Sequence, residues 1–511
     1  MGNSILRDSH VRTLALTGIY LLACGVFTYV YWVDKVTDYS FGYEYGNVAA
    51  SVATGNGFAD VFGDGAGPTS WCPPAYVLIH ASMYVVFGVK TPAAMWALLF
   101  LRVLVLTGTL YLLLRIDYSP PLNKYRFLIM PVFAVLSGVI LIKDFDDKAL
   151  NVFLSVVTVY LVAQIAEKGF EKYKTPAYVL AIVLPLSNVF LLGGSLLLVL
   201  ANSFFLINKR EAPVPGRHCI ALILLSVAAT LTWGIRNKAV LGQFVPFKSN
   251  LWFEVYMSNV ADADGVMQRS NWIAHHPIAN PDVAQSYVVQ GELQFMERYK
   301  RETIDYLKTN SGDFVRKVLR RSAHAFIFLI SSDDLITADT INIPAGDLDK
   351  LRAQGALIWD YWVNLDIAEQ DFRSTVNKIN LSRPSLVIKD WQEKKSLLAS
   401  RKFRSLGQTA AGFLYALVPT VAILICLCFK SIRNLTIFRL TLYFLFLSWT
   451  PYIVLSHYAR YQMFQVGMFT VLIFLCLAGM LEATHALRHS LSRYKGSRLP
   501  HPSQPDNFPG S

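Results

Sequence analysis

Long, nearly uninterrupted runs of apolar residues constrain the fold of this chain more than any other feature. Most runs are roughly 18 to 22 residues long, the length of helix that crosses about 30 Å of hydrocarbon. Apolar residues make up 54% of the chain and charged residues only 16%, whereas soluble domains contain about a quarter charged residues. We therefore predict an all-α polytopic membrane protein.

About ten of these runs are predicted to span the membrane. They lie at residues 13–33, 93–115, 125–143, 149–166, 177–190, 191–207, 218–236, 409–429, 435–456 and 462–484. The shorter apolar run at 74–88 is predicted to lie flat at the membrane interface. With that choice, the basic side chains of the short loops and of the tail fall in the cytoplasm, and so do both termini. This placement accounts for the net charge of +12, and no nucleic-acid partner is predicted.

The predicted spans divide the chain into four parts. These are an N-terminal transmembrane module at 1–236, including a first extracytoplasmic loop of interfacial helices at 34–92, a larger extracytoplasmic domain of mixed structure at 237–408, C-terminal transmembrane helices at 409–484 and a basic cytoplasmic tail at 485–511. Within the large outer domain, apolar periodicity predicts amphipathic helices at 284–308 and 312–330, and 332–407 is predicted to pack as a small subdomain.

Carboxylates in the predicted outer segments are the candidates for acid–base chemistry. Glu44 follows the first span, where interfacial helices would hold it at the membrane surface. A carboxylate so placed can act as a general base on a hydroxyl or an amine. Asp146 and Asp147 precede the helix predicted at 149–166. They either orient an acceptor or a cation, or cap this helix, whose dipole favours acids at its N-terminus.

Two arginines lie on the predicted outer side, against the positive-inside bias. Arg236 and Arg460 are suited to bind a phosphate group, with pairing to lipid headgroups as the alternative. The histidines at 275, 276 and 457 have no second set of ligands at metal spacing, so no metal site is predicted. No cofactor is predicted either, and a divalent metal that helps to bind phosphate is left open.

Several short motifs follow one another in a fixed order along the chain. They are Tyr45-x-x-Val48-Ala49, Gly55-x-Gly57-Phe58, Pro73-Pro74-x-Tyr76 and Phe87-Gly88 in the first outer loop, and later Trp233-Gly234-Ile235-Arg236-Asn237, Gly242-Gln243-Phe244-Val245-Pro246 and Arg460-Tyr461. This order resembles the integral-membrane glycosyltransferases of the GT-C class. Within that class, it resembles the bacterial members of the family of protein O-mannosyltransferases and aminoarabinose transferases.

The resemblance implies a GT-C-like fold and an inverting transferase that moves a hexosyl or pentosyl group from a polyprenyl-phosphate carrier. It also implies a bacterial inner membrane, an active site facing the periplasm or cell exterior, and donor phosphate near Arg236, Arg460 and Tyr461. Many members carry their catalytic acid a few residues before the loop tyrosine, a position that is Phe41 here. Glu44, directly before Tyr45, is therefore the first candidate for the base, and Asp38 is the next.

We therefore expect a glycosyltransferase whose partners are the lipid bilayer, a polyprenyl-phosphate-linked sugar donor and a glycan, lipid or protein acceptor. The alternatives are a membrane transporter or lipid flippase, and a non-catalytic binder of lipid-linked glycans. The sequence contains no Walker A motif, dinucleotide-binding glycine fingerprint or Gly-x-Ser-x-Gly elbow. It also shows no convincing internal repeat, a feature common in transporters.

Overall fold

The computed structural model describes residues 2–33, 43–142, 146–200, 214–261, 265, 274–278, 280–327, 413–456 and 459–496. Within these ranges every regular element is helical, apart from one isolated β-bridge between Ala59 and Pro68. Six helical stretches are long and apolar enough to cross a membrane, namely His10–Trp32, Pro92–Arg115, Lys148–Lys168, Gly216–Leu241, Thr436–Leu455 and Gln462–Ser490. They match six of the ten predicted spans in position, length and composition, and they support the assignment as a membrane protein.

The remaining four predicted spans correspond to shorter helices among the described residues. These are α6 (Ile129–Ile142), α8 (Lys174–Ser187), α9 (Leu192–Leu200) and α21 (Val418–Cys428). A 14-residue helix such as α6 rises only about 21 Å, which is less than the roughly 30 Å of the hydrocarbon core. The predicted count of ten spans is therefore not established, although these short helices pack among the long ones.

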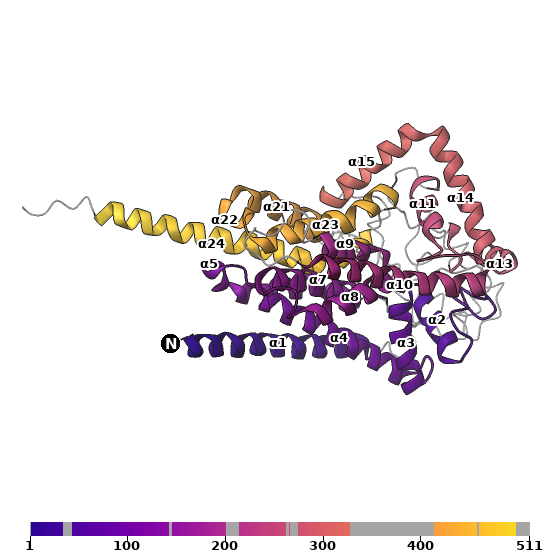
Figure 1. The fold of residues 1–511 in the computed structure, drawn as a ribbon, viewed down its shortest axis with the longest axis horizontal. Helices are drawn as coiled ribbons and strands as arrows, with labels where there is room; N and C mark the ends of the chain where they lie inside the picture. Colours follow the sequence, from indigo (N-terminus) through magenta and orange to yellow (C-terminus); the bar gives the residue numbers. More distant parts are fainter. Residues whose placement is uncertain are drawn as a thin grey trace, which may run out of the picture.

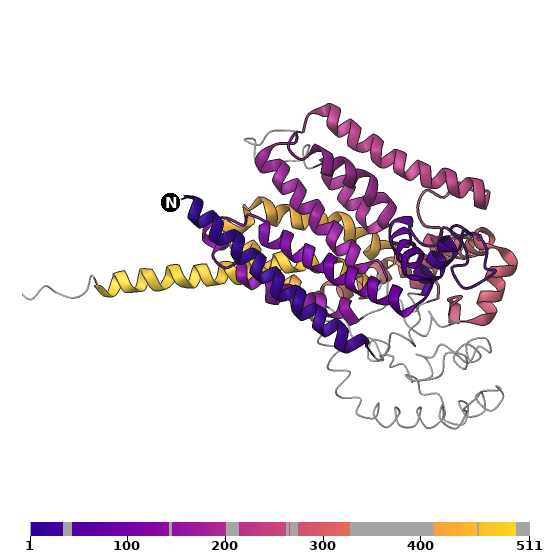
Figure 2. The same cartoon turned by 90° about the horizontal axis from the view of Figure 1, so that it is seen from below.

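The long helices lie side by side in a bundle (Figure 1), and apolar side chains are both buried inside it and exposed on its surface. The helices α1 (Gly2–Trp32), α4 (Pro92–Arg115), α7 (Lys148–Lys168), α10 (Gly216–Leu241), α23 (Thr436–Leu455) and α24 (Val466–Gly496) include the six candidate spans. Figure 2 shows α10 along one edge of the bundle, and its residues Ile220, Leu224, Leu231 and Ile235 are exposed. An exposed apolar stripe of this kind suits contact with lipid tails.

Glycine allows the short helix α9 and the long helix α23 to approach each other closely. A Cβ atom at Gly193 of α9 would lie 2.9 Å from the backbone nitrogen of Ser448 and 2.9 Å from the carbonyl carbon of Leu447. Both atoms belong to the backbone of α23, so a side-chain rotation cannot relieve the contact. Small residues serve this purpose widely in membrane helix packing.

Replacing Gly193 by alanine is therefore expected to destabilise the bundle, because α9 and α23 must separate to admit the methyl group. We expect a cost of about 1 to 3 kcal/mol and a lower midpoint of thermal unfolding in detergent. The control is Gly138→Ala in α6, where a Cβ atom meets nothing within 4 Å. Equal unfolding midpoints for the two variants would contradict the expected strain.

A second group of helices gathers at the end of the bundle opposite the N-terminus (Figure 1). It contains α2 (Tyr43–Ala53), α3 (Pro74–Phe87), α11 (Leu251–Asn259), α13 (Pro281–Gln290) and α14 (Glu292–Thr309), followed by α15 (Ser311–Ile327). Buried residues of the first loop, such as Trp71 and Tyr76, share one hydrophobic core with Phe253, Tyr287 and Phe295. The loop predicted at 34–92 and the first part of the segment predicted at 237–408 thus pack together as one outer layer.

Several predicted boundaries differ from the structure. The helix predicted at 284–308 is two helices, α13 and α14, which meet at Gly291 in a positive-φ conformation that favours glycine. Helix α10 continues past 236 to Leu241, and α24 continues into the predicted tail as far as Gly496. The mixed structure predicted for the outer domain is not seen among its described residues, which are helical, and 332–407 lies outside the described ranges.

Candidate active site

Glu44 lies in the first turn of α2, at the outer end of the bundle. Its Oε1 atom lies 3.2 Å from the indole nitrogen of Trp71 and 3.2 Å from Nε2 of His276. The Glu44 side chain is 21% exposed, so the carboxylate is held by two ring nitrogens yet remains accessible. Two N–H donors and the N-terminus of a helix both favour the ionised form of a carboxylate.

The ring of His276 is itself held in one orientation. Its Nδ1 atom accepts a hydrogen bond from the backbone N–H of Ile278 at 3.2 Å. In a neutral imidazole the proton then resides on Nε2, which is the atom that faces Glu44. The rings of Phe62, Trp71 and Phe253 surround His276, with centroids 5.5 to 5.8 Å away. His276 is therefore a buried, oriented donor to the Glu44 carboxylate.

Trp71 is positioned by a buried carboxylate from a distant part of the chain. Glu292, at the start of α14, is 4% exposed and accepts hydrogen bonds from both the backbone N–H and the hydroxyl of Ser70, at 2.8 and 3.0 Å. It also accepts bonds from the hydroxyls of Thr69 and Tyr287. These bonds fix the loop immediately before Trp71 and thereby direct the indole N–H at Glu44.

Replacing Glu292 by alanine is expected to leave the buried hydroxyls of Thr69, Ser70 and Tyr287 without their acceptor. Each unsatisfied buried group costs about 1 to 3 kcal/mol, so we expect a total loss of at least about 3 kcal/mol and an outer layer that proteases cleave more readily. Limited proteolysis and thermal unfolding measure this effect. Glu297→Ala on the same helix is the control, because the Glu297 side chain is 48% exposed. Equal protease resistance in the two variants would rule out this role for Glu292.

Arg236 supports the same loop from the end of α10. Its guanidinium donates to the carbonyl oxygens of Phe58 and Thr69, both at 2.9 Å, and to the side-chain oxygen of Asn237 at 2.9 Å. It also lies over the rings of Phe58 and Trp233. Arg236 therefore holds the first loop against the end of α10. The predicted contact between Arg236 and a donor phosphate stays a prediction.

Asp147 and Asp146 have different roles at the start of α7. Asp147 occupies the N-cap position without a side-chain capping bond. Its carboxylate instead accepts a hydrogen bond of 2.6 Å from Asn188, whose side-chain oxygen accepts a bond from the hydroxyl of Tyr452 at 3.1 Å. Asp146 accepts the backbone N–H of Lys148 at 3.1 Å and forms an ion pair with the Lys148 ammonium. Asp146 thus caps the start of α7, whereas Asp147 is buried and joins α7 to Asn188 and, through it, to Tyr452 of α23.

Tyr45, the residue next to Glu44 in α2, lies close to the negative charge of Asp147. Burial raises the pKa of the Tyr45 hydroxyl well above its usual value, and the negative charge of Asp147, together with a side-chain hydrogen bond to it, raises that pKa further. Tyr45 directly follows Glu44 in α2, and its ring packs edge-on against Tyr76 of α3. The Tyr45 hydroxyl therefore stays protonated at neutral pH.

The neighbouring groups of Glu44 are held in their neutral forms. Burial raises the pKa of the Cys72 thiol well above its usual value, and the charge of Glu44 raises it further. Burial also raises the pKa of Tyr76 to about 12. A thiolate or phenolate nucleophile is thus disfavoured at neutral pH, and Glu44 is the group near this point that is suited to accept a proton.

The other predicted site residues are only partly described. Asp38 lies outside the described residues. Arg460 and Tyr461 begin η5 (Ala459–Gln465), a 3-10 helix that packs beside α7, but their side chains lie outside the described part of the structure. Within the ranges that the structure describes, no group of three or more His, Cys, Asp or Glu side chains is placed to hold a metal ion.

Three residues of this site were not predicted as functional from the sequence: Trp71, His276 and Glu292. The sequence predicts no metal site at His275 and His276, because no second set of ligands lies at metal spacing. The partner of His276 in the structure is instead a carboxylate 232 positions away, which the local sequence does not reveal. Glu292 falls within a predicted amphipathic helix, where a glutamate usually faces solvent. A buried carboxylate on such a helix gives no local signal of its own.

Comparisons with known proteins identify no relative of this chain. No protein-family model matches it. No curated protein matches it, and no solved structure does.

Proposed function

We propose that this protein is an inverting glycosyltransferase that uses a polyprenyl-phosphate-linked sugar as its donor. The observation that carries the proposal is the Glu44 carboxylate, held by Trp71 and His276 at the end of a bundle of apolar helices and still 21% exposed. A general base needs a fixed position and access to its substrate. A donor whose lipid tail lies in the membrane would hold its sugar at the membrane surface, at the same depth as Glu44 and beside the outer layer.

In the proposed reaction, a hydroxyl group of the acceptor gives its proton to the Glu44 carboxylate. The acceptor oxygen then forms a bond to the anomeric carbon of the sugar as the bond between that carbon and the phosphate oxygen breaks. Polyprenyl phosphate leaves, and the anomeric configuration is inverted because a single displacement occurs. Trp71 and His276 hold the Glu44 carboxylate in place and so act as positioning residues.

The order of motifs around Glu44 supports this proposal. Tyr45, Phe58 and Tyr76 are among the residues of the first loop that carry the resemblance to GT-C enzymes, and each has an identifiable contact in the structure. Tyr45 and Tyr76 pack against each other beside the site, and Phe58 anchors Arg236. The resemblance and the geometry therefore converge on one region of the molecule, which favours surface chemistry over transport through the bundle.

The proposal is tested with the full chain purified into lipid nanodiscs. Polyprenyl-phospho-sugars that carry a labelled hexose or pentose are supplied with a panel of glycan, lipid and peptide acceptors, and release of polyprenyl phosphate is measured. We expect release from at least one donor, coupled one-to-one to a glycosylated product. Binding of donors without release across the whole panel would instead favour a non-catalytic binder, and translocation of intact donor would favour a flippase.

A further inference from the structure

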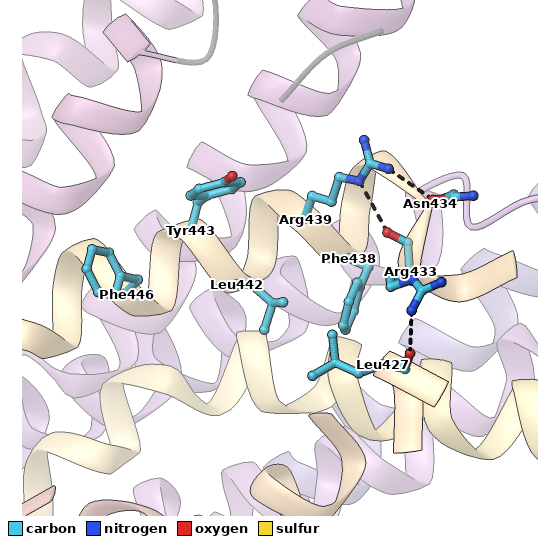
Figure 3. A pocket seen from close by; sticks show the side chains of 8 residues that line it. All are labelled: Leu427, Arg433, Asn434, Phe438, Arg439, Leu442, Tyr443 and Phe446. Atoms are coloured by element: carbon cyan, nitrogen blue, oxygen red, sulfur yellow. Dashed lines mark hydrogen bonds between the residues drawn. The ribbon is translucent and has the colours of Figure 1, made fainter. Parts of the chain in front are cut away.

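A surface groove lies at the end of the bundle opposite to Glu44. It runs along the first turns of α23, beside α21 and α22 (Lys430–Arg433), and encloses a cavity of about 640 Å³. Figure 3 shows Arg433 and Arg439 at one end of the groove, and Leu442, Tyr443 and Phe446 along α23. No Asp or Glu is among the residues that line it. The groove is therefore cationic at one end and apolar along the rest.

The two arginines retain donors for a ligand. Arg433 donates through NH1 to the carbonyl oxygen of Leu427 at 3.3 Å. Arg439 donates through Nε to the carbonyl of Arg433 at 3.2 Å and through NH2 to the side chain of Asn434 at 3.1 Å. These bonds hold the two side chains at the mouth of the groove. The other guanidinium N–H groups make no hydrogen bond with the rest of the described structure, and no carboxylate neutralises either charge there.

The apolar part of the groove is exposed on the surface of the helix bundle. Tyr443 is 46% exposed, Phe446 is 65% exposed and Leu427, from α21, is 39% exposed. Tyr443 and Phe446 lie four and seven residues beyond Arg439, or about 6 and 10 Å along the helix axis. A molecule whose phosphate sits at the arginines would thus place the start of its hydrocarbon chain against these rings.

We propose that this groove binds an anionic diacyl phospholipid of the surrounding membrane. Its phosphate would accept charge-assisted hydrogen bonds from Arg433 and Arg439, since guanidinium groups match phosphate geometry. Its acyl chains would lie along Leu442, Tyr443 and Phe446. Basic pockets at the ends of membrane helices recognise lipid headgroups in this way. The site is distinct from the proposed transfer site and does not depend on it.

The test uses the full chain, delipidated in a non-ionic detergent and analysed by native mass spectrometry. Dioleoyl phosphatidylglycerol is titrated against dioleoyl phosphatidylcholine, so that the two lipids differ only in their headgroups. We expect tighter binding of phosphatidylglycerol, and a loss of roughly thirty-fold in the Arg433→Gln/Arg439→Gln variant, at about 1 kcal/mol for each basic residue. The matched control is Arg115→Gln/Arg488→Gln, which removes two exposed arginines that do not line the groove.

Two further arms keep the test decisive. Phe446→Ala alters an exposed ring without touching the core and is expected to weaken phosphatidylglycerol binding severalfold. Inorganic phosphate at millimolar concentration is expected not to displace the lipid, because it lacks acyl chains. Unchanged affinity in the groove variants, equal losses in the control, or displacement by inorganic phosphate alone would each overturn the proposal.

Discussion

Replacing Glu44 by glutamine is expected to lower the rate of sugar transfer by a hundredfold or more while leaving the protein folded. Glutamine has the shape of glutamate and keeps a carbonyl oxygen for the donors on Trp71 and His276. It cannot accept a proton, and a positioned general base contributes roughly 10²- to 10⁴-fold to a rate. The measurement is the single-turnover rate at saturating donor, together with the midpoint of thermal unfolding.

The control for this prediction is Asp282→Asn, which removes an exposed carboxylate of the same outer layer, near the start of α13. We expect the control to retain the wild-type rate. A Glu44→Gln variant that transfers sugar at the wild-type rate would eliminate Glu44 as the base and leave Asp38 as the next candidate.

Replacing Arg321 by methionine is expected to destabilise the protein strongly, by a cost similar to that of Glu292→Ala. Arg321 lies on α15 and is fully buried. Its guanidinium donates to the carbonyl oxygens of Ile453 and Val454, at 2.8 and 2.7 Å, in the last turn of α23. It also donates to the carbonyl of Ser258, in the last turn of α11, at 3.1 Å. The last carbonyls of a helix have no partner within the helix, so one side chain satisfies the ends of two helices.

Methionine fills a similar volume but donates no hydrogen bond, so these buried carbonyls would lose their partner. At about 1 to 3 kcal/mol for each unsatisfied group, we expect a loss of at least about 3 kcal/mol and a lower unfolding midpoint. The unfolding midpoint of Arg321→Lys is expected to lie between those of the wild type and Arg321→Met. A single ammonium group can donate some of these hydrogen bonds but cannot reproduce all the contacts of the planar guanidinium. Arg320→Met is the control, since Arg320 is exposed on the same helix. A wild-type midpoint for Arg321→Met would contradict this role.

Features that depend on one stretch of sequence were predictable. The six longest apolar helices follow directly from the length of their runs, and the helix predicted at 312–330 corresponds to α15. Periodicity could not show that Arg321 faces inward on that helix, because its partners in α11, at Gly265 and in α23 lie at least 56 residues away along the chain. Charged residues on amphipathic helices usually face solvent, and only the tertiary fold reveals an exception.

The candidate site was predictable to a similar extent. The position of Glu44 just beyond the first span could be deduced from the chain order alone. Its contacts with His276 and the link from Trp71 through Ser70 to Glu292 join residues more than 200 positions apart. Such pairs leave no spacing that a single sequence can reveal. Asp147 shows the same limit, because its local sequence left open positioning of an acceptor or cation and capping, and gave no sign of its partner Asn188.

The central claim, base-assisted transfer by single displacement at Glu44, is tested most directly by the stereochemistry of the product. The purified full chain is given a polyprenyl-phospho-sugar of known anomeric configuration, and the configuration of the transferred sugar is read by proton NMR. Inversion is the predicted result, because the acceptor oxygen attacks the anomeric carbon directly. Retention of configuration would exclude a single displacement from the face opposite the phosphate and would contradict the role assigned to Glu44.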